Sequence, residues 1–427
     1  MTNMNIKDIY SRIKSRNTLF YKVLIFIVPL KLLRHINQYL GIYPSAFGDE
    51  IREIKQVLVG PHWNITSANS RKHIELEAQI LKYTNSSYAV AVSSGGVGIQ
   101  MVLRALGLAP GELVGHQVDT CNAVPQSILN SHQTPFFLDI SKKTHMLDTS
   151  AISNLNHKSP STLIATHMWG YHEDVDSLLK IKEFNLIEDC CLALGLKRNG
   201  VHVGNQGIAG VFSFGASKPM QAGEGGIIVT NSKDLDKELR IIRNWGESIG
   251  ESRDLKKLSL NGRISETTSA IILSQLKMID DRILRVRENV RSFFRAISES
   301  EIFSPLESLE NTESVYTRIV LKINRIKLKK EQDSSFIIEQ FRKSGIGAFY
   351  ANFEPVNQQT FFQNESWVKW CHELDEFTKT NNSKIFLNAQ EIFEFEGFSL
   401  PQECFRTKKN LNKTIDIVRK LERFYLK

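Results

Sequence analysis

The sequence predicts an α/β protein in which helices cover both faces of a central sheet. Short apolar runs, typical of buried strands, alternate with longer segments of helical period. At 427 residues the chain exceeds one ordinary domain, so we expect two substructures. We place a large domain at residues 49–300 and a small C-terminal domain at 301–427, after an apolar and basic appendage at 1–48.

The expected elements follow the hydrophobic periodicity along the chain. The strands of the large domain are expected at Tyr88–Ser93, Pro135–Asp139, Ser161–His167, Leu186–Asp189, Ala209–Phe214 and Gly226–Thr230. Its helices are expected at Glu50–Val59, Ile74–Tyr83, Val97–Leu106, Val175–Phe184, Asp234–Asn244 and Ser265–Val290. The C-terminal domain has an expected strand at Ser314–Ile323 and helices at Lys330–Ser344 and Leu411–Leu426.

The composition is that of an ordinary globular protein, with 41% hydrophobic and 23% charged residues. The net charge of +8 suits anionic substrates, and no basic and aromatic module indicates nucleic-acid binding. The five cysteines are odd in number and show no CxxC spacing. We therefore expect neither a disulfide framework nor a metal site, and a cytoplasmic location.

Residues 19–33 are strongly apolar and are flanked by basic residues. The uninterrupted apolar run, Val23–Leu30, is far shorter than the roughly 20 residues that a membrane-spanning helix needs. Three interpretations stay open: a helix packed on the protein or on a partner subunit, peripheral contact with a membrane, and an export signal. We favour the first.

One lysine, Lys218, lies in a short turn between two apolar strands. The strand Ala209–Phe214 precedes it, and a Gly-Glu-Gly-Gly run at 223–226 follows. Ser213, near the end of the first strand, could place its hydroxyl on a bound phosphate. A lysine in a turn is more often simply exposed, so Lys218 indicates function only together with other groups.

Two other motifs supply such groups. Ser94, Gly95 and Gly96, which we call the cradle, open a helix whose free N–H groups attract anions, although a plain strand-to-helix turn would look the same. Asp189 ends an apolar strand, where a buried carboxylate needs a cation, while Glu188 would face solvent or a backbone group. An anion cradle, a carboxylate and an amine are the parts that hold pyridoxal 5'-phosphate.

A set of short phrases extends the pattern: Trp63-Asn-Ile-Thr, Ser94-Gly95, Leu103-Arg-Ala-Leu-Gly107, Pro135-Phe-Phe-Leu-Asp-Ile140, His167-Met-Trp-Gly170, Ile187-Glu188-Asp189, Phe212-Ser-Phe-Gly-Ala-Ser-Lys218, Gly223-Glu-Gly-Gly226, Arg243-Asn-Trp-Gly246 and Asn261-Gly-Arg263. With these phrases the chain resembles the DegT/DnrJ/EryC1/StrS family of sugar aminotransferases from about residue 50 to 300, and more weakly to the C-terminus. The resemblance implies the fold-type I architecture of pyridoxal-phosphate enzymes. That architecture has a mixed seven-stranded sheet flanked by helices and a small C-terminal α+β domain.

The resemblance also implies roles for individual residues. Lys218 would be the Schiff-base lysine and Asp189 the partner of the ring nitrogen. Asn261 would reach the phosphate across the interface of a homodimer, so that each active site needs two chains. The phosphate itself would be held by the cradle and by a strand hydroxyl: Ser94, Gly95, Gly96 and Ser213.

Three positions depart from the family pattern. Gly96 stands where the family usually has threonine, and Cys121 stands where it usually has an aromatic ring on the cofactor. Leu192 stands where it often has glutamine or histidine. The segment 345–355, which would contact substrate, is also divergent. Lys218 is retained, whereas relatives that became sugar dehydratases carry histidine there.

The sequence thus predicts a pyridoxal-phosphate-dependent aminotransferase. It would move an amino group from a donor, glutamate in the family, to a keto or aldehyde carbon of a nucleotide-linked or related sugar, for surface polysaccharide or natural-product synthesis. Two alternatives remain. One is a lyase or dehydratase using the same cofactor, and the other is a non-catalytic relative that acts as a scaffold, which the three departures would favour.

Overall fold

The computed structural model describes residues 50–60, 71–155, 159–182, 184–216, 218–247, 254–328, 333–372 and 374–425. The predicted appendage, including the apolar residues 19–33, lies outside these ranges. None of the helices within them combines the length and the apolar character needed to cross a membrane.

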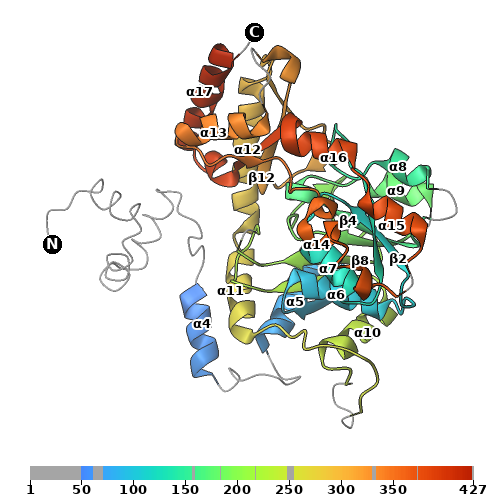
Figure 1. Cartoon of the computed structure of the whole chain (residues 1–427). Helices are drawn as coiled ribbons and strands as arrows, with labels where there is room; N and C mark the ends of the chain where they lie inside the picture. Colours follow the sequence, from blue (N-terminus) through green and yellow to red (C-terminus); the bar gives the residue numbers. More distant parts are fainter. Residues whose placement is uncertain are drawn as a thin grey trace.

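A seven-stranded sheet forms the centre of the molecule (Figure 1). Its strands lie in the order β1-β9-β8-β5-β4-β2-β3, and β9 alone runs antiparallel to its two neighbours. The predicted mixed sheet of an α/β fold is therefore confirmed. The strands are β1 (Tyr88–Val92), β2 (Leu113–Gln117), β3 (Thr134–Leu138), β4 (Thr162–Thr166), β5 (Asn185–Asp189), β8 (Ala209–Ser213) and β9 (Gly226–Thr230).

Helices bury both faces of this sheet, as the alternating apolar pattern requires. In β1, Val90 and Val92 face one core with α6 (Gly95–Ala105) and α10 (Lys233–Arg243). Ala89 and Ala91 face the opposite core. Successive residues of a strand point to opposite faces, so a short, wholly apolar run is the mark of a strand covered on both sides. The remaining helices around the sheet are α4 (Glu50–Val59), α5 (Arg71–Thr84), α7 (Ala123–Leu129), α8 (Thr149–Ser153) and α9 (Val175–Ile181).

The expected long helix from Ser265 to Val290 is instead two helices. These are α11 (Glu266–Leu276) and α12 (Ile279–Ala296), separated at Lys277 and Met278. The apolar residues of α11 belong to the core of the large sheet, whereas the second half of α12 belongs to the core around a smaller sheet. The first turns of α12, with Ile279 and Ile283, still belong to the core of the large sheet, so α12 itself spans both cores. Periodicity alone did not reveal the break.

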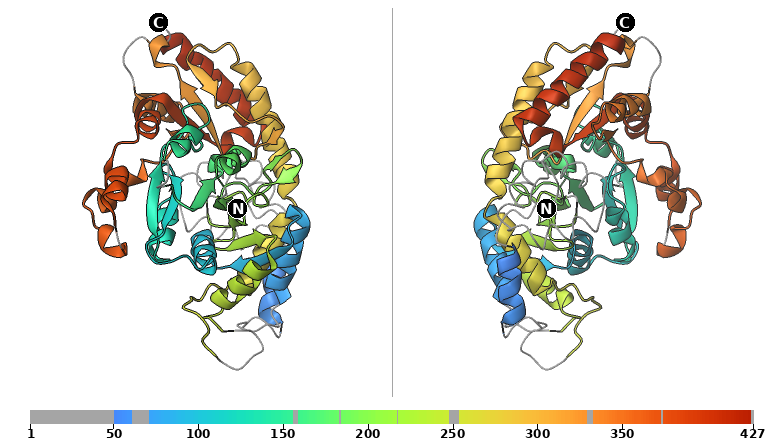
Figure 2. Two further views of the ribbon diagram at one scale, coloured as in Figure 1. Left: turned by 90° about the vertical axis from the view of Figure 1, so that its right-hand side faces the viewer. Right: turned by 90° about the vertical axis from the view of Figure 1, so that its left-hand side faces the viewer.

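The smaller sheet has four antiparallel strands in the order β10-β12-β14-β13. Its strands are β10 (Phe303–Pro305), β12 (Arg318–Ile323), β14 (Gly397–Pro401) and β13 (Phe349–Tyr350). The views in Figure 2 show α12 beside α17 (Lys408–Tyr425), and with α13 (Ser334–Lys343) these helices pack against this sheet. The expected strand at Ser314–Ile323 begins later, at Arg318. The domain boundary near residue 300 stays a prediction.

A C-terminal segment returns to the edge of the large sheet. Helix α15 (Glu376–Ser383) contacts β3, the last strand. The Asn382 carboxamide accepts from the Phe137 N–H at 3.1 Å and donates to the Pro135 carbonyl at 2.6 Å, while Asn381 donates to the Phe137 carbonyl at 2.9 Å. These bonds satisfy backbone groups that would otherwise leave an open strand edge.

The buried carboxylate of Glu77 joins α5 to α10 and β1. It accepts from Arg243 at 2.7 Å, from Arg240 at 3.1 Å and from the Ala91 N–H at 2.9 Å. Because Glu77→Ala would leave the buried Arg243 cation unpaired, we expect the free energy of unfolding to fall by about 3–5 kcal/mol, measured by urea denaturation. Glu75→Ala, on the exposed side of the same helix, is the control and should change it by at most about 0.5 kcal/mol. Equal effects of the two substitutions would contradict this account.

Candidate active site

The predicted site residues gather at one edge of the large sheet. Strands β1, β2, β5 and β8 run parallel to one another, so their carboxyl ends meet at the same edge. The cradle follows β1, Cys121 follows β2, Asp189 ends β5 and Lys218 follows β8. In open α/β sheets this edge is where ligands bind.

The cradle lies at the start of α6. Ser94 is the N-cap residue, and its Oγ accepts from the Val97 N–H at 3.2 Å. A Cβ atom on Gly95 would lie 2.6 Å from Cys191 Sγ and 2.8 Å from Ser213 Cβ. Gly95 is therefore needed for close approach, and the backbone N–H groups at the positive end of α6 lie beside the Ser213 side chain.

Asp189 is buried at the end of β5 and is held by neighbours on both oxygens. Its Oδ1 accepts from the Cys191 N–H at 3.0 Å, and its Oδ2 accepts from Thr166 Oγ1 at 3.4 Å. Thr166 in turn lies 3.4 Å from Thr120 Oγ1. These contacts fix the carboxylate between the ends of β2, β4 and β5.

Glu188, the preceding residue, points to the opposite face and serves the fold. It is completely buried and accepts from His167 Nε2 at 3.1 Å and from the N–H groups of Gly204, Gln206 and Gly207 at 2.8 Å each. Burial alone would raise the pKa of this carboxyl, but the bonds from His167 and the backbone hold the pKa below its ordinary value. Of the two expected orientations, the one toward backbone groups is right and the one toward solvent is wrong.

His167, Glu188 and Cys190 place their ligand atoms within 4.8 Å of one another, a spacing that could suit a metal ion. Glu188 is already engaged by four donors, and His167 Nδ1 accepts from the Glu173 N–H at 3.1 Å. The lone pairs of this cluster therefore serve internal hydrogen bonds.

Lys218 is half-buried in the turn after β8, where its N–H donates to the Gly215 carbonyl at 3.2 Å. The loop that follows is tied to α11, because Gln275 accepts from the Gln221 N–H at 2.9 Å and donates to the Gln221 carbonyl at 2.8 Å. The position of the lysine thus depends on packing against α11 as well as on the strand that precedes it.

Cys191 lies among the predicted groups, although the sequence analysis gave it no role. Burial raises the pKa of its thiol well above the ordinary value; the Asp189 carboxylate adds to this effect and the Lys218 ammonium opposes it. Cys121, which is exposed, also raises the pKa of this thiol. Asp189, Lys218 and Cys121 therefore lie close enough to Cys191 to act on one group.

Asn261 borders the cradle within its own chain. The Ser93 N–H donates to the carbonyl of the next residue, Gly262, at 2.8 Å. The Asn261 side chain is exposed and accepts from the Arg263 N–H at 3.4 Å. Its expected contact with phosphate across a dimer stays a prediction.

An aromatic wall lies near these strand ends; the sequence analysis named the phrase around Trp169 and the segment 345–355 separately but did not bring them together. Its rings are Trp169, Phe353 and Phe349, with Trp169 and Phe353 5.2 Å apart. The Arg318 guanidinium lies 4.1 Å from the Trp169 ring and 4.5 Å from the Phe349 ring, and no hydrogen-bond acceptor contacts it within the described ranges. Burial lowers the pKa of Arg318 to about 10. No sequence signal links these residues, because they come from three separate segments.

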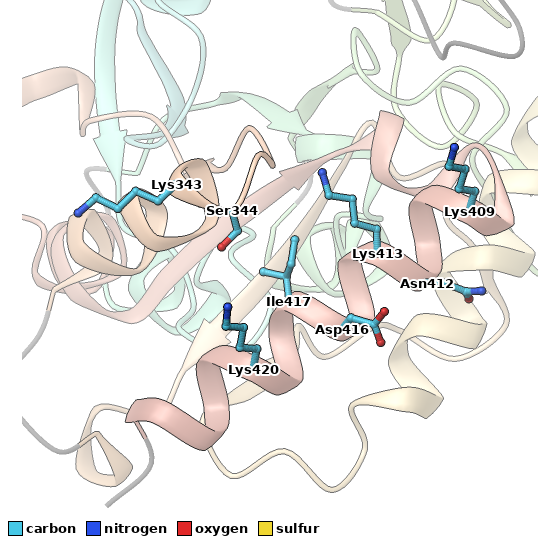
Figure 3. A pocket seen from close by; sticks show the side chains of 8 residues that line it. All are labelled: Lys343, Ser344, Lys409, Asn412, Lys413, Asp416, Ile417 and Lys420. Atoms are coloured by element: carbon cyan, nitrogen blue, oxygen red, sulfur yellow. The ribbon is translucent and has the colours of Figure 1, made fainter. Parts of the chain in front are cut away.

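A different hollow, of about 750 Å³, lies at the surface between the end of α13 and α17 (Figure 3). Lys343 comes from α13, and Lys409, Lys413 and Lys420 lie along α17. These helices cover the smaller sheet, away from the strand ends that carry the predicted residues (Figure 1). This basic hollow is therefore not the candidate active site.

Comparison with known proteins agrees with this placement. The model of the DegT/DnrJ/EryC1/StrS aminotransferase family matches residues 47–381. The chain belongs to this family. The resemblance predicted from the sequence is confirmed, and so are the enzyme class, a pyridoxal-phosphate-dependent aminotransferase, and its cofactor.

The relatives to which this chain is similar are named for different sugar substrates or products. A GDP-perosamine synthase of Escherichia coli O157:H7 is 29% identical over 275 residues, which cover 62% of this chain and 75% of that protein. A UDP-N-acetyl-3-dehydro-alpha-D-glucosamine 3-aminotransferase of Acidithiobacillus ferrooxidans is 29% identical over 204 residues, which cover 47% of this chain and 55% of that protein. The solved aminotransferase of Psychrobacter cryohalolentis shares the fold, with a TM-score of 0.79 at 21% identity, covering 89% of this chain and 98% of that one.

The residues at the strand ends fit pyridoxal phosphate. The Gly95 position, the Ser213 side chain and the start of α6 converge on a space that a Cβ atom would obstruct, and α6 offers N–H donors to an anion. A fixed, buried carboxylate suits a protonated ring nitrogen, and Lys218 lies near it on a separate element.

The two glycines of the cradle should respond differently to substitution. Gly95→Ala forces Cβ against Cys191 and Ser213, so we expect affinity for pyridoxal phosphate to fall by about tenfold or more. Gly96→Ala meets only an ordinary contact, 3.5 Å from Ala123 Cβ, and should stabilise α6 by about 0.5–1 kcal/mol. Cofactor titration and thermal unfolding measure both effects. Equal cofactor affinities of the two variants would show that Gly95 does not shape the site.

Proposed function

We propose that this protein transfers an amino group from glutamate to a keto or aldehyde carbon of a nucleotide-linked sugar. The observation that carries the proposal is the placement of three groups at the carboxyl edge of one sheet: the buried Asp189 carboxylate at the end of β5, Lys218 in the turn after β8, and the start of α6 beside Ser213. The names of relatives that act on GDP- and UDP-linked sugars support the acceptor class. Surface polysaccharide or natural-product synthesis would use such an amino sugar.

Each residue has a distinct part in the proposed reaction. Bound pyridoxal phosphate would supply an aldehyde carbon that carries the amino group and a ring that withdraws electrons from the reacting carbon. Asp189 would hold the ring nitrogen protonated, and Ser213 with the cradle would anchor the phosphate. The Lys218 amine would carry the cofactor and then move a proton to and from the substrate carbon.

The donor needs a partner for its carboxylate, and Arg318 is suited to that part. Aromatic rings cover two sides of its guanidinium, which leaves the N–H edges to bind a carboxylate in two parallel hydrogen bonds. Backbone hydrogen bonds link Arg318 to the site. The N–H of the preceding residue, Thr317, donates to the Trp169 carbonyl at 2.9 Å, and the His167 N–H donates to the Asp189 backbone carbonyl at 3.0 Å.

The finer assembly belongs to the same proposal. We expect a homodimer in which Asn261 completes the neighbouring site, in the cytoplasm, with residues 19–33 as the segment for any peripheral membrane contact.

Lys218→Ala removes the amine that would carry the cofactor. We expect the visible absorbance band of the bound cofactor to be lost or shifted, and conversion of the cofactor by glutamate to slow by about a thousandfold or more. Stopped-flow absorbance and detection of 2-oxoglutarate measure these changes. Lys233→Ala, an exposed lysine at the start of α10, is the control. Undiminished turnover by Lys218→Ala would refute the assignment.

Arg318→Gln tests the donor site. Loss of a charge-assisted, two-bond contact should raise KM for glutamate by about 10- to 100-fold and shrink the preference for glutamate over an amine that has no carboxylate. Steady-state kinetics with both donors measure the two effects. Arg325→Gln is the matched control, because Arg325 also lies over a ring, Phe395, at 4.2 Å but is exposed. An unchanged preference in Arg318→Gln would remove Arg318 from the donor site.

A further inference from the structure

A cavity of about 400 Å³ opens along one face of α7. Its volume is within the range of small-molecule sites. One wall is α7 and the other is the segment 359–370, which includes α14 (Thr360–Gln363). Its lining includes two aromatic rings and four carboxamides: Phe361, Trp370, Asn122, Gln126, Asn130 and Gln359.

Two aromatic rings present exposed surface at this cavity. Phe361 is 38% exposed and Trp370 is 57% exposed, so both rings offer apolar surface to a ligand. The Phe361 ring packs edge-on against the Phe362 ring, with the ring centroids 5.2 Å apart. The Phe362 ring in turn packs edge-on against the buried Phe137 ring, with the centroids 5.1 Å apart. The Phe361 ring is therefore a rigid platform on which a flat ligand could stack.

Four carboxamides complete the lining: Asn122, Gln126, Asn130 and Gln359. Within the part of the chain that the structure describes, none of these side chains has a hydrogen-bond partner. None of the lining residues is charged, and the one cation over a lining ring among the described residues is the Lys369 ammonium, 5.8 Å from the centroid of Trp370. A carboxamide both donates and accepts, so it matches the polar edge of a neutral ring. Aromatic faces with neutral amides favour such a ring over a phosphate or a carboxylate.

The cavity begins next to the candidate active site. Asn122 directly follows Cys121, and Ser127 of α7 donates to the Gly96 carbonyl at 2.9 Å. This bond fixes α7 against the cradle. From Asn122 to Asn130 the helix covers about 12 Å, so a ligand that reacts beside Lys218 could extend along it.

We propose that this cavity binds the distal ring of the amino acceptor, a neutral ring with polar edges that stacks on Phe361 and Trp370. The ring is either the base of a nucleotide-linked sugar or a further sugar residue. The inference rests on the proposed function. It adds which part of the acceptor, at a distance from the reacting carbon, the protein recognises. Bases stack on aromatic side chains, and asparagine or glutamine pairs with base edges.

The test uses the full chain loaded with pyridoxal phosphate. Binding of uridine, guanosine and thymidine, and separately of glucose and N-acetylglucosamine, is measured by ligand-observed NMR and calorimetry. We expect one class to bind, and expect Trp370→Ala and Phe361→Ala to weaken that binding by about tenfold or more. Trp370→Phe should restore most of it, and Phe424→Ala, an exposed ring on α17, is the control.

The outcomes separate the ligand sources and the two proposals. Binding of nucleosides alone identifies the base, and binding of the sugars alone identifies a sugar residue. The inference is overturned if neither class binds, if binding ignores both ring substitutions, or if acrylamide cannot quench Trp370 in the assembled protein, since copies of the chain would then cover this face. Gln126→Leu gives a second test should a ring variant fail to fold.

The reaction of glutamate with the cofactor tests the proposed function separately from the cavity. Glutamate should convert the cofactor in the unsubstituted protein without any acceptor. If it does not, the aminotransferase proposal fails whatever the cavity binds. If it does and no ring binds, the cavity inference alone fails.

Discussion

The end of β5 depends on one buried carboxylate that takes no part in the proposed chemistry. Glu188 accepts four hydrogen bonds, three from backbone N–H groups of the 204–207 turn and one from His167. A fully buried charge is tolerable only with such compensation, and it makes the strand end rigid. Because successive strand residues face opposite ways, fixing Glu188 toward the turn fixes Asp189 toward the candidate active site.

Close backbone approach is the second constraint on the site. A Cβ atom on Gly226 would lie 2.7 Å from the Ser94 carbonyl carbon, just as one on Gly95 would strike Cys191. Glycine at both positions lets the start of β9, the cradle and the end of β8 come together. Gly95 and Gly226 therefore matter for packing between elements, and not only for a local turn.

Much of this arrangement could be predicted from sequence, because its signals are local. The run from Tyr88 to Gly96 contains both the strand and the start of the helix, and the strand at Ala209–Ser213 leads directly to Lys218. Family resemblance then supplied the seven-stranded sheet. Strand β2 went unrecognised because Gly115, His116 and Gln117 interrupt its apolar pattern; all three are nevertheless buried. The break between α11 and α12 falls at Lys277 and Met278, where neither a glycine nor a proline marks the end of a helix, so the periodic pattern did not reveal it.

The part that faces substrate could not be predicted, because it is assembled from distant segments. The Phe353 N–H donates to Asp119 across 234 residues, and the Asn382 carboxamide bonds to β3 across about 245 residues. The first contact brings the divergent segment 345–355 to the end of β2, and the second brings α15 to the outer edge of β3. We expect a sequence change in segment 345–355 to alter the proposed acceptor site without moving Asp189 or Lys218. Because the residues for the cofactor and the residues for the acceptor come from different segments, one fold can bind the same cofactor in relatives that are named for different sugars.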